Sequence, residues 1–163
     1  MACNGGTQCQ AGSWQLKNMR DETWQVLDNI FSRTPILKSE KVEFNEIIAA
    51  ERKVGIVLED DYKEFVHRYG GAIVGPFRVF GLRKAIPMGQ NEESFVEITN
   101  SFRRQHWPGV EKWAVISTDH AGNPVGLDDK GKIWISDHDT HAVQAIAATF
   151  EMFLRKQCLK LPD

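Results

Sequence analysis

Residues 44–71, FNEIIAAERKVGIVLEDDYKEFVHRYGG, constrain the fold of this chain more than any other segment. Apolar residues recur there every three or four positions in two blocks, which predicts two short amphipathic helices. Gly55 follows the first block and Gly70 the second, where helices commonly end in a left-handed residue. Asp60 or Asp61 is placed to cap the second helix through its backbone N–H groups. The segment lacks a nucleophile with a base, a phosphate loop and spaced metal ligands, which is typical of a scaffold.

Apolar periodicity predicts further elements on both sides of this segment. Helices are expected at residues 14–31, 94–104 and 142–159, the last as one long closing helix. Strands are expected at residues 77–82, 113–117, 124–127 and 133–136. The predicted class is α+β, with N-terminal helices, a central mainly antiparallel sheet of about four to six strands and a long C-terminal helix packed on the sheet.

The chain is expected to divide into three parts. Residues 1–12 are polar and glycine-rich and predict a disordered tail, residues 13–37 a helical extension, and residues 38–161 the folded domain. The first residues lack the basic and apolar regions of a signal peptide, and no apolar run approaches the ~20 residues of a membrane span. The three cysteines have no metal-ligand spacing, which favours a reducing compartment. We therefore expect a cytoplasmic protein without a membrane anchor.

Charge is unevenly distributed along the sequence. The net charge of −2 and the pI of about 6.2 argue against direct nucleic-acid binding, which usually needs a concentrated basic face. Residues 21–64 hold 11 acidic and 6 basic residues, a net of −5, whereas residues 65–116 hold 7 basic and 4 acidic, a net of +3. The acidic segment is either a solvated helix face or a docking surface for a basic protein partner.

Two sets of residues are candidates for contact with a partner. Asp60, Asp61 and Glu64 are expected to be the most exposed acidic residues of the scaffold helices. Arg103, Arg104 and Trp107 fall near the end of the helix expected at residues 94–104, and arginine and tryptophan are enriched in binding hot spots.

An enzymatic alternative depends on acidic residues and histidines in two turns. Asp119 and His120 follow one expected strand, and Asp137 and His138 follow the last one, so neighbouring strand ends could bring them together as a metal or general-base site. Their spacing matches no established metal motif. The competing interpretation is that Asp119 and Asp137 accept hydrogen bonds within their own turns, while Asp139 or Thr140 caps the closing helix.

One family pattern runs through most of the chain. It comprises Phe44, Ile47, Ile48, Glu51, Arg52, Gly55, Ile56, Leu58, Asp61, Tyr62, Phe65, Val66, Tyr69, Gly70, Gly71, then FGL at residues 80–82, WAVIS at 113–117, GNP at 122–124, Asp128, Gly131, Ile133 and Trp134, and Phe150, Glu151, Phe153 and Leu154. This order resembles the SUKH superfamily of Smi/Knr-type domains. It identifies residues 38–161 as a SUKH-like domain.

The resemblance implies a function in binding rather than catalysis, with no cofactor. SUKH domains occur in bacterial immunity proteins, which bind and neutralise a cognate toxin that is often a nuclease or deaminase, and in a fungal cell-wall regulator. Glu59 stands where the family usually has proline, and the family supplies no partner-contact residue by motif. The alternatives are a metal-dependent hydrolase using Asp119, His120, Asp137 and His138, and a regulatory scaffold.

Overall fold

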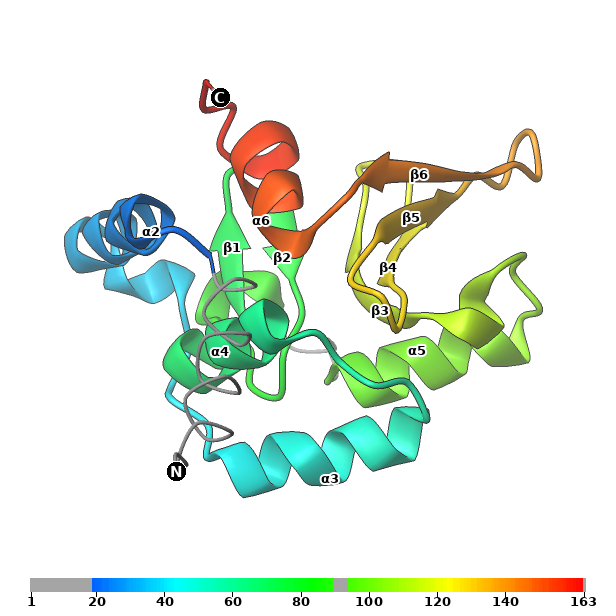
Figure 1. Ribbon diagram of the computed structural model, residues 1–163, viewed down its shortest axis with the longest axis horizontal. Coiled ribbons are helices and arrows are strands. Elements are labelled where there is room, and N and C mark those ends of the chain that lie inside the picture. The colour runs from blue at the N-terminus through cyan, green and yellow to red at the C-terminus, as the bar shows by residue number, and fades with distance from the viewer. Residues whose placement is uncertain (1–18, 90–93, 163) are drawn as a thin grey trace, which may run out of the picture.

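The computed structural model describes residues 19–89 and 94–162, which form an α+β fold (Figure 1). Its helices are α2 (Asp21–Arg33), α3 (Phe44–Val54), α4 (Asp60–Tyr69), α5 (Phe95–Arg104) and α6 (Phe150–Met152), with short 3-10 turns η1 (Pro35–Leu37), η2 (Ile86–Met88) and η3 (Val110–Lys112) and a π-helical segment η4 (Phe153–Cys158). The predicted tail and the first residues of the expected opening helix lie outside the described residues.

The helices predicted within residues 44–71 are confirmed. Gly55 and Gly70 end them with positive φ angles of 76° and 74°. Glycine is required at residue 70, because an added Cβ would lie 2.1 Å from the backbone oxygen of Glu40. The predicted cap is wrong: Glu59 occupies the N-cap position of α4, and Asp60 and Asp61 are its first helical residues. There they face the positive end of the helix dipole.

The strands form two antiparallel sheets. Strands β1 (Ala72–Val74) and β2 (Phe77–Val79) make a hairpin, and β3 (Ala114–Thr118), β4 (Pro124–Leu127), β5 (Ile133–Ser136) and β6 (Val143–Ala147) make a four-stranded meander in that order. The predicted strands at residues 124–127 and 133–136 are confirmed. Strand β1 was not predicted, and β2 ends three residues before the end of the strand expected at residues 77–82. The two sheets meet where the Phe80 N–H donates to the Ile116 carbonyl at 2.7 Å.

The prediction of one long closing helix is wrong. Its first part is the strand β6, which pairs with β5, and only α6 and η4 are helical. The cap residue is neither Asp139 nor Thr140 but Thr149, whose hydroxyl accepts from the Met152 N–H at 3.1 Å. The apolar spacing from Val143 to Cys158 fits a helix, but pairing with β5 determines the conformation of its first part.

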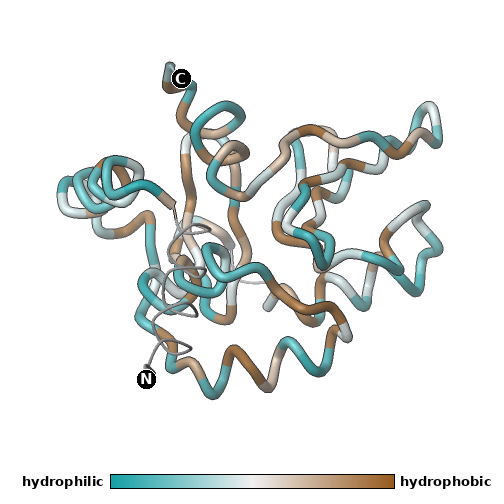
Figure 2. Tube along the Cα trace, viewed as in Figure 1, coloured by the Kyte–Doolittle hydropathy of each residue, from teal (hydrophilic) through white to brown (hydrophobic). Residues whose placement is uncertain are grey.

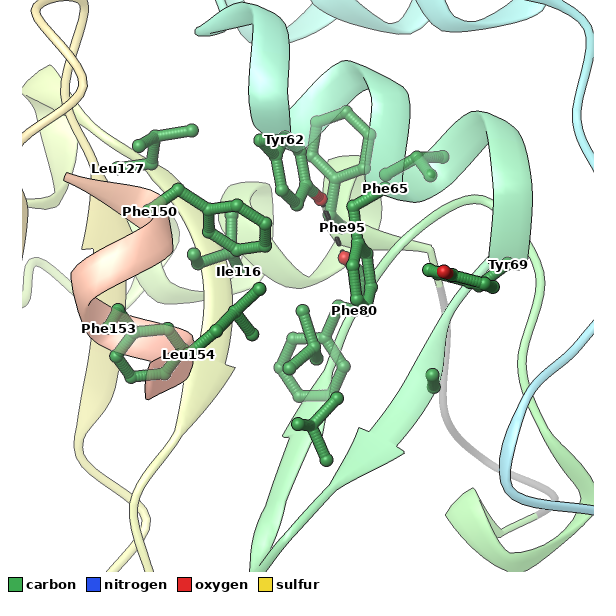
Figure 3. Packing of buried hydrophobic residues seen from close by; sticks show 14 of the residues in the cluster. Tyr62, Phe65, Tyr69, Phe80, Phe95, Ile116, Leu127, Phe150, Phe153 and Leu154 are labelled. Carbon is green, nitrogen blue, oxygen red and sulfur yellow. Dashed lines mark hydrogen bonds between the residues drawn. The ribbon is translucent and has the colours of Figure 1, made fainter. Parts of the chain in front are cut away.

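A large aromatic core lies between the helices and the sheets. Figure 3 shows the side chains of Tyr62, Phe95 and Phe150 converging in it, with edge-to-face ring contacts at 5.7 Å and 5.4 Å from Tyr62. The Tyr62 hydroxyl donates to the Phe80 carbonyl at 2.6 Å, so this buried ring also fixes the chain after β2. A smaller cluster around Trp113 forms a second apolar centre.

Helix α2 packs into the same main core through Met19, just before it, and Trp24, Leu27 and Phe31. The short link between α3 and α4 is one of the strongly hydrophobic stretches of the chain (Figure 2). It buries Leu58 but leaves Val57 68% exposed. Across residues 19–89 and 94–162, no helix combines the length and the apolar character needed to span a membrane.

Candidate protein-binding surface

Two adjoining hollows meet at the first turn of α4, where both are lined by Asp60 and Asp61. Their volumes are about 640 and 530 Å³. We call this surface the acidic groove. Its charged lining residues are Asp21, Glu59, Asp60, Asp61, Glu64, Asp129 and Glu151, with Lys63, Arg68 and Lys130. Seven acidic groups against three basic ones give the groove an excess of negative charge.

The acidic side chains of α4 differ in exposure. The side chains of Asp60 and Glu64 are 52% and 36% exposed. Asp60 lies 3.8 Å from the Lys63 ammonium, and Glu64 lies 2.8 Å from the Arg68 guanidinium. Exposed pairs of this kind are weak, so both carboxylates remain able to contact a partner.

The prediction that Asp61 is among the most exposed acidic residues is wrong, because Asp61 is buried. Its carboxylate accepts a 2.7 Å hydrogen bond from the Met19 N–H. Burial raises its pKa above the ordinary range of an aspartate, against the effect of that hydrogen bond. Asp61 therefore holds the chain before α2 against α4, and its carboxylate is committed inside the molecule.

Glu59 lines the second hollow of the groove and is half-buried. Burial, and then the negative charge of Asp61, raises the pKa of Glu59 to about 8. Its Oε1 atom is buried and has no hydrogen-bond partner among the described residues. An added Cβ on Gly131 would lie 3.0 Å from the Glu59 side chain, which shows how closely the β4–β5 hairpin covers it. At neutral pH, Glu59 is therefore mainly protonated, and the groove carries its charge on the remaining carboxylates.

Apolar side chains flank the acidic groove. Phe44 lines the first hollow and is 43% exposed, and its ring stacks on His67 at 4.1 Å between centroids. Val57 lines the second hollow. Exposed apolar residues beside a charged groove are suited to anchor a partner that the charge attracts. Phe44 begins α3 and Val57 lies in the link between α3 and α4, and the fold brings both to the border of the groove.

The second predicted contact set, at the end of α5, lies apart from the acidic groove. Arg103 is half-buried and donates to the carbonyls of Val54 (2.8 Å), Val110 (3.1 Å) and Trp113 (2.9 Å). Arg104 is exposed. Trp107 is half-buried and packs edge-on against Phe102 at 5.4 Å and His138 at 6.0 Å. Arg103 thus has an internal bonding role, while Arg104 and part of Trp107 are accessible.

The aspartates of the enzymatic alternative are held within their turns. Asp119 accepts from the Ala121 and Asn123 N–H groups, both at 2.9 Å, and Asp137 accepts from the Asp139 N–H at 2.8 Å. Burial alone would raise the pKa of Asp119, but the hydrogen bonds from Asn123 and Ala121 lower it. Both aspartates therefore accept hydrogen bonds within their own turns, as the interpretation that competes with a metal site predicted.

Asn123, which was not among the predicted site residues, links the two turns of this region. Its side-chain oxygen contacts His138 Nδ1 at 2.6 Å, and its amide donates to Asp119 at 3.0 Å, so an amide joins the two turns. In the part of the chain that the structure describes, no three His, Cys, Asp or Glu side chains are grouped to hold a metal ion.

Comparison with protein-family models matches residues 41–156 to the SMI1/KNR4 family (SUKH-1). The chain belongs to this family. The match confirms the resemblance seen in the sequence and covers the elements from α3 to most of η4. A search of curated proteins finds no significant match. SMI1/KNR4 membership supports a role in toxin immunity or a cell-wall-related role.

Within this SMI1/KNR4 domain, the acidic groove combines family and non-family parts. Asp60 and Glu64 lie in the matched range, whereas Asp21 belongs to α2, before it. Glu59 also lies in the matched range and occupies the N-cap position of α4. The groove is therefore formed partly by the matched domain and partly by α2, which precedes it.

Proposed function

We propose that this SMI1/KNR4 protein is an immunity protein that binds and neutralises a cognate toxin of the nuclease or deaminase type in the cytoplasm, without catalysing a reaction itself. Family membership supports the class of function. The observation that carries the proposal is the acidic groove, where five acidic residues besides protonated Glu59 and buried Asp61 outnumber three basic ones, beside exposed Phe44 and Val57.

An enzyme that acts on nucleic acid presents basic residues to the phosphate backbone. An acidic groove complements such a surface, speeds encounter and competes with the nucleic acid for the same residues. Phe44 and Val57 would then exclude water around the charged contacts, which strengthens them.

The first experiment is co-expression of this protein with the toxin encoded beside its gene. We expect the cells to survive, and the two purified proteins to elute together from gel filtration. A toxin that kills equally with and without this protein, and forms no complex with it, would contradict the proposal. The cell-wall-related role of the family would then be the one to examine.

A variant pair tests whether the acidic groove is the binding surface. Asp60→Asn with Glu64→Gln removes two exposed charges from the groove, and we expect the dissociation constant of the complex to rise roughly tenfold or more. Glu40→Gln with Glu111→Gln removes two exposed charges elsewhere and should leave affinity nearly unchanged. Equal losses in both pairs would show that net charge, and not the groove, determines binding.

A further inference from the structure

Strand β6 has a free outer edge. It is the last strand of the order β3-β4-β5-β6, and no other strand or isolated bridge of the described residues pairs with it (Figure 1). Val143, Gln144 and Ala145 are exposed, and the whole strand, VQAIA, has no charged residue and no proline. Soluble proteins usually protect such an edge with charges, proline or a covering segment.

The pairing of β6 with β5 determines which backbone groups point outward. The Asp137 N–H donates to the Ala142 carbonyl at 2.9 Å, so these residues form a hydrogen-bonded pair at the start of the ladder. Antiparallel pairs alternate between hydrogen-bonded and non-hydrogen-bonded positions. Val143 and Ala145, opposite Ser136 and Trp134, therefore direct their N–H and C=O groups away from β5.

This spacing is self-complementary. If a second β6 lies antiparallel, with Gln144 of both copies on the two-fold axis, Val143 of each copy faces Ala145 of the other. The four outward groups of each strand then match as four hydrogen bonds. The register shift in the β5–β6 ladder leaves Ile146 as the extra residue, so the regular outer edge ends after Ala145.

We infer that β6 is a homodimer interface, through which two copies of this chain join their four-stranded sheets into one of eight strands. The absence of charge favours a second copy as the occupant, because a two-fold axis places each residue near its own equivalent and a charged edge would repel itself. Gln144 meets Gln144, whose amides can donate and accept. No β6 residue lines the acidic groove, so the two surfaces are formed by different residues.

The test measures association of the whole chain by sedimentation velocity over concentrations from about 10 µM to about 1 mM, because a short strand pair gives a weak interface. We expect a reversible monomer–dimer equilibrium for the natural protein. Gln144→Lys and Gln144→Glu should each weaken the dimer at least about tenfold, since like charges then face each other on the axis. An equimolar mixture should associate more tightly than either variant alone.

Matched controls separate this effect from surface charge in general. Gln25→Lys and Gln25→Glu make the same changes at an exposed position of α2 and should leave association unchanged. Ala145→Pro removes an outward N–H without touching the β5 ladder and should also weaken the dimer at least about tenfold. Circular dichroism checks that each variant is folded.

Two results would overturn the inference. One is a natural protein that stays monomeric across the whole concentration range. The other is a dimer that keeps its affinity in both Gln144 variants, with a mixture no tighter than either. Neither result depends on a toxin, so the inference stands or falls independently of the proposed immunity function.

Discussion

Burial of Glu59 at the start of α4 couples the stability of the protein to pH. Burial and the charge of Asp61 raise its pKa from an ordinary 4.5 to about 8, so the folded protein holds a proton that the unfolded chain releases. The stabilisation is fully present below about pH 4.5 and is lost as the pH rises toward 8. Each unit of pKa difference corresponds to about 1.4 kcal/mol.

Glu59→Gln isolates this effect, because the amide resembles the protonated carboxyl in shape and does not titrate. Relative to the natural protein, we expect the variant to gain on the order of a few kcal/mol between pH 4.5 and pH 9. Urea unfolding at a series of pH values measures it. Glu64→Gln, at a more exposed position, serves as the control and should follow the natural pH profile. Parallel profiles for Glu59→Gln and the natural protein would contradict the assignment.

The neighbouring arginines at the end of α5 have different roles despite their identical chemistry. Arg103→Met removes the hydrogen bonds to the carbonyls of Val54, Val110 and Trp113, and we expect a loss of about 2–4 kcal/mol in the free energy of unfolding. Arg104→Met should change it by less than about 0.5 kcal/mol, because Arg104 is exposed. Chemical denaturation of both variants measures the contrast, and equal losses would refute it.

Sequence reasoning identified these residues but could not separate them by role. Asp60 and Asp61 are adjacent acids, and only the position of Met19 makes Asp61 the buried one. Arg103 differs from Arg104 because it donates to the carbonyls of residues 54, 110 and 113, which the tertiary fold brings together. Such contacts between distant segments leave no signal in local periodicity.

Among the elements, α2 and the C-terminal segment are joined by the buried hydroxyl of Thr23. Thr23 Oγ1 donates to Glu151 at 2.6 Å and accepts from Arg155 at 3.1 Å. Thr23→Ala should cost about 1–3 kcal/mol, since buried Arg155 loses the Thr23 hydroxyl as an acceptor while keeping its 2.9 Å hydrogen bond to the Pro162 carbonyl. Ser32→Ala, on an exposed position of the same helix, should cost less than about 0.5 kcal/mol. Thermal unfolding of both variants gives the comparison, and a neutral Thr23→Ala would contradict this role.

The elements that sequence reasoning predicted well are those whose local signals agree. Turn residues lie directly next to β4 and β5, and glycines end α3 and α4. The positions of these four elements were therefore predicted correctly. The prediction for β6 failed because polar and apolar residues alternate only weakly in VQAIA, and its apolar residues continue the helical spacing of Phe150 and Phe153. Pairing with β5 determines the conformation of β6. Because most of its side chains are exposed, packing against the core imposes neither a strand-like nor a helix-like apolar pattern on its sequence.

At the scale of the whole molecule, the core extends beyond the family match. The match begins at residue 41, but Met19, Trp24, Leu27 and Phe31 belong to the main apolar cluster and are at most 8% exposed. Burying such a side chain contributes about 1.5–3 kcal/mol. Four of them together contribute roughly 6 kcal/mol or more, which is comparable to the whole stability of many domains.

Deletion of residues 1–33 should therefore leave most of the chain unfolded at 25 °C, as measured by circular dichroism and urea titration. It removes those four side chains and exposes Tyr69, which Phe31 contacts at 4.8 Å between ring centroids. Adding a peptide of residues 19–33 should restore a cooperative transition by mass action, whereas the same peptide with Leu27→Ala and Phe31→Ala should not. An unchanged urea midpoint after the deletion would instead show that residues 38–161 fold independently, because α2 would then add contacts without determining the stability of the core.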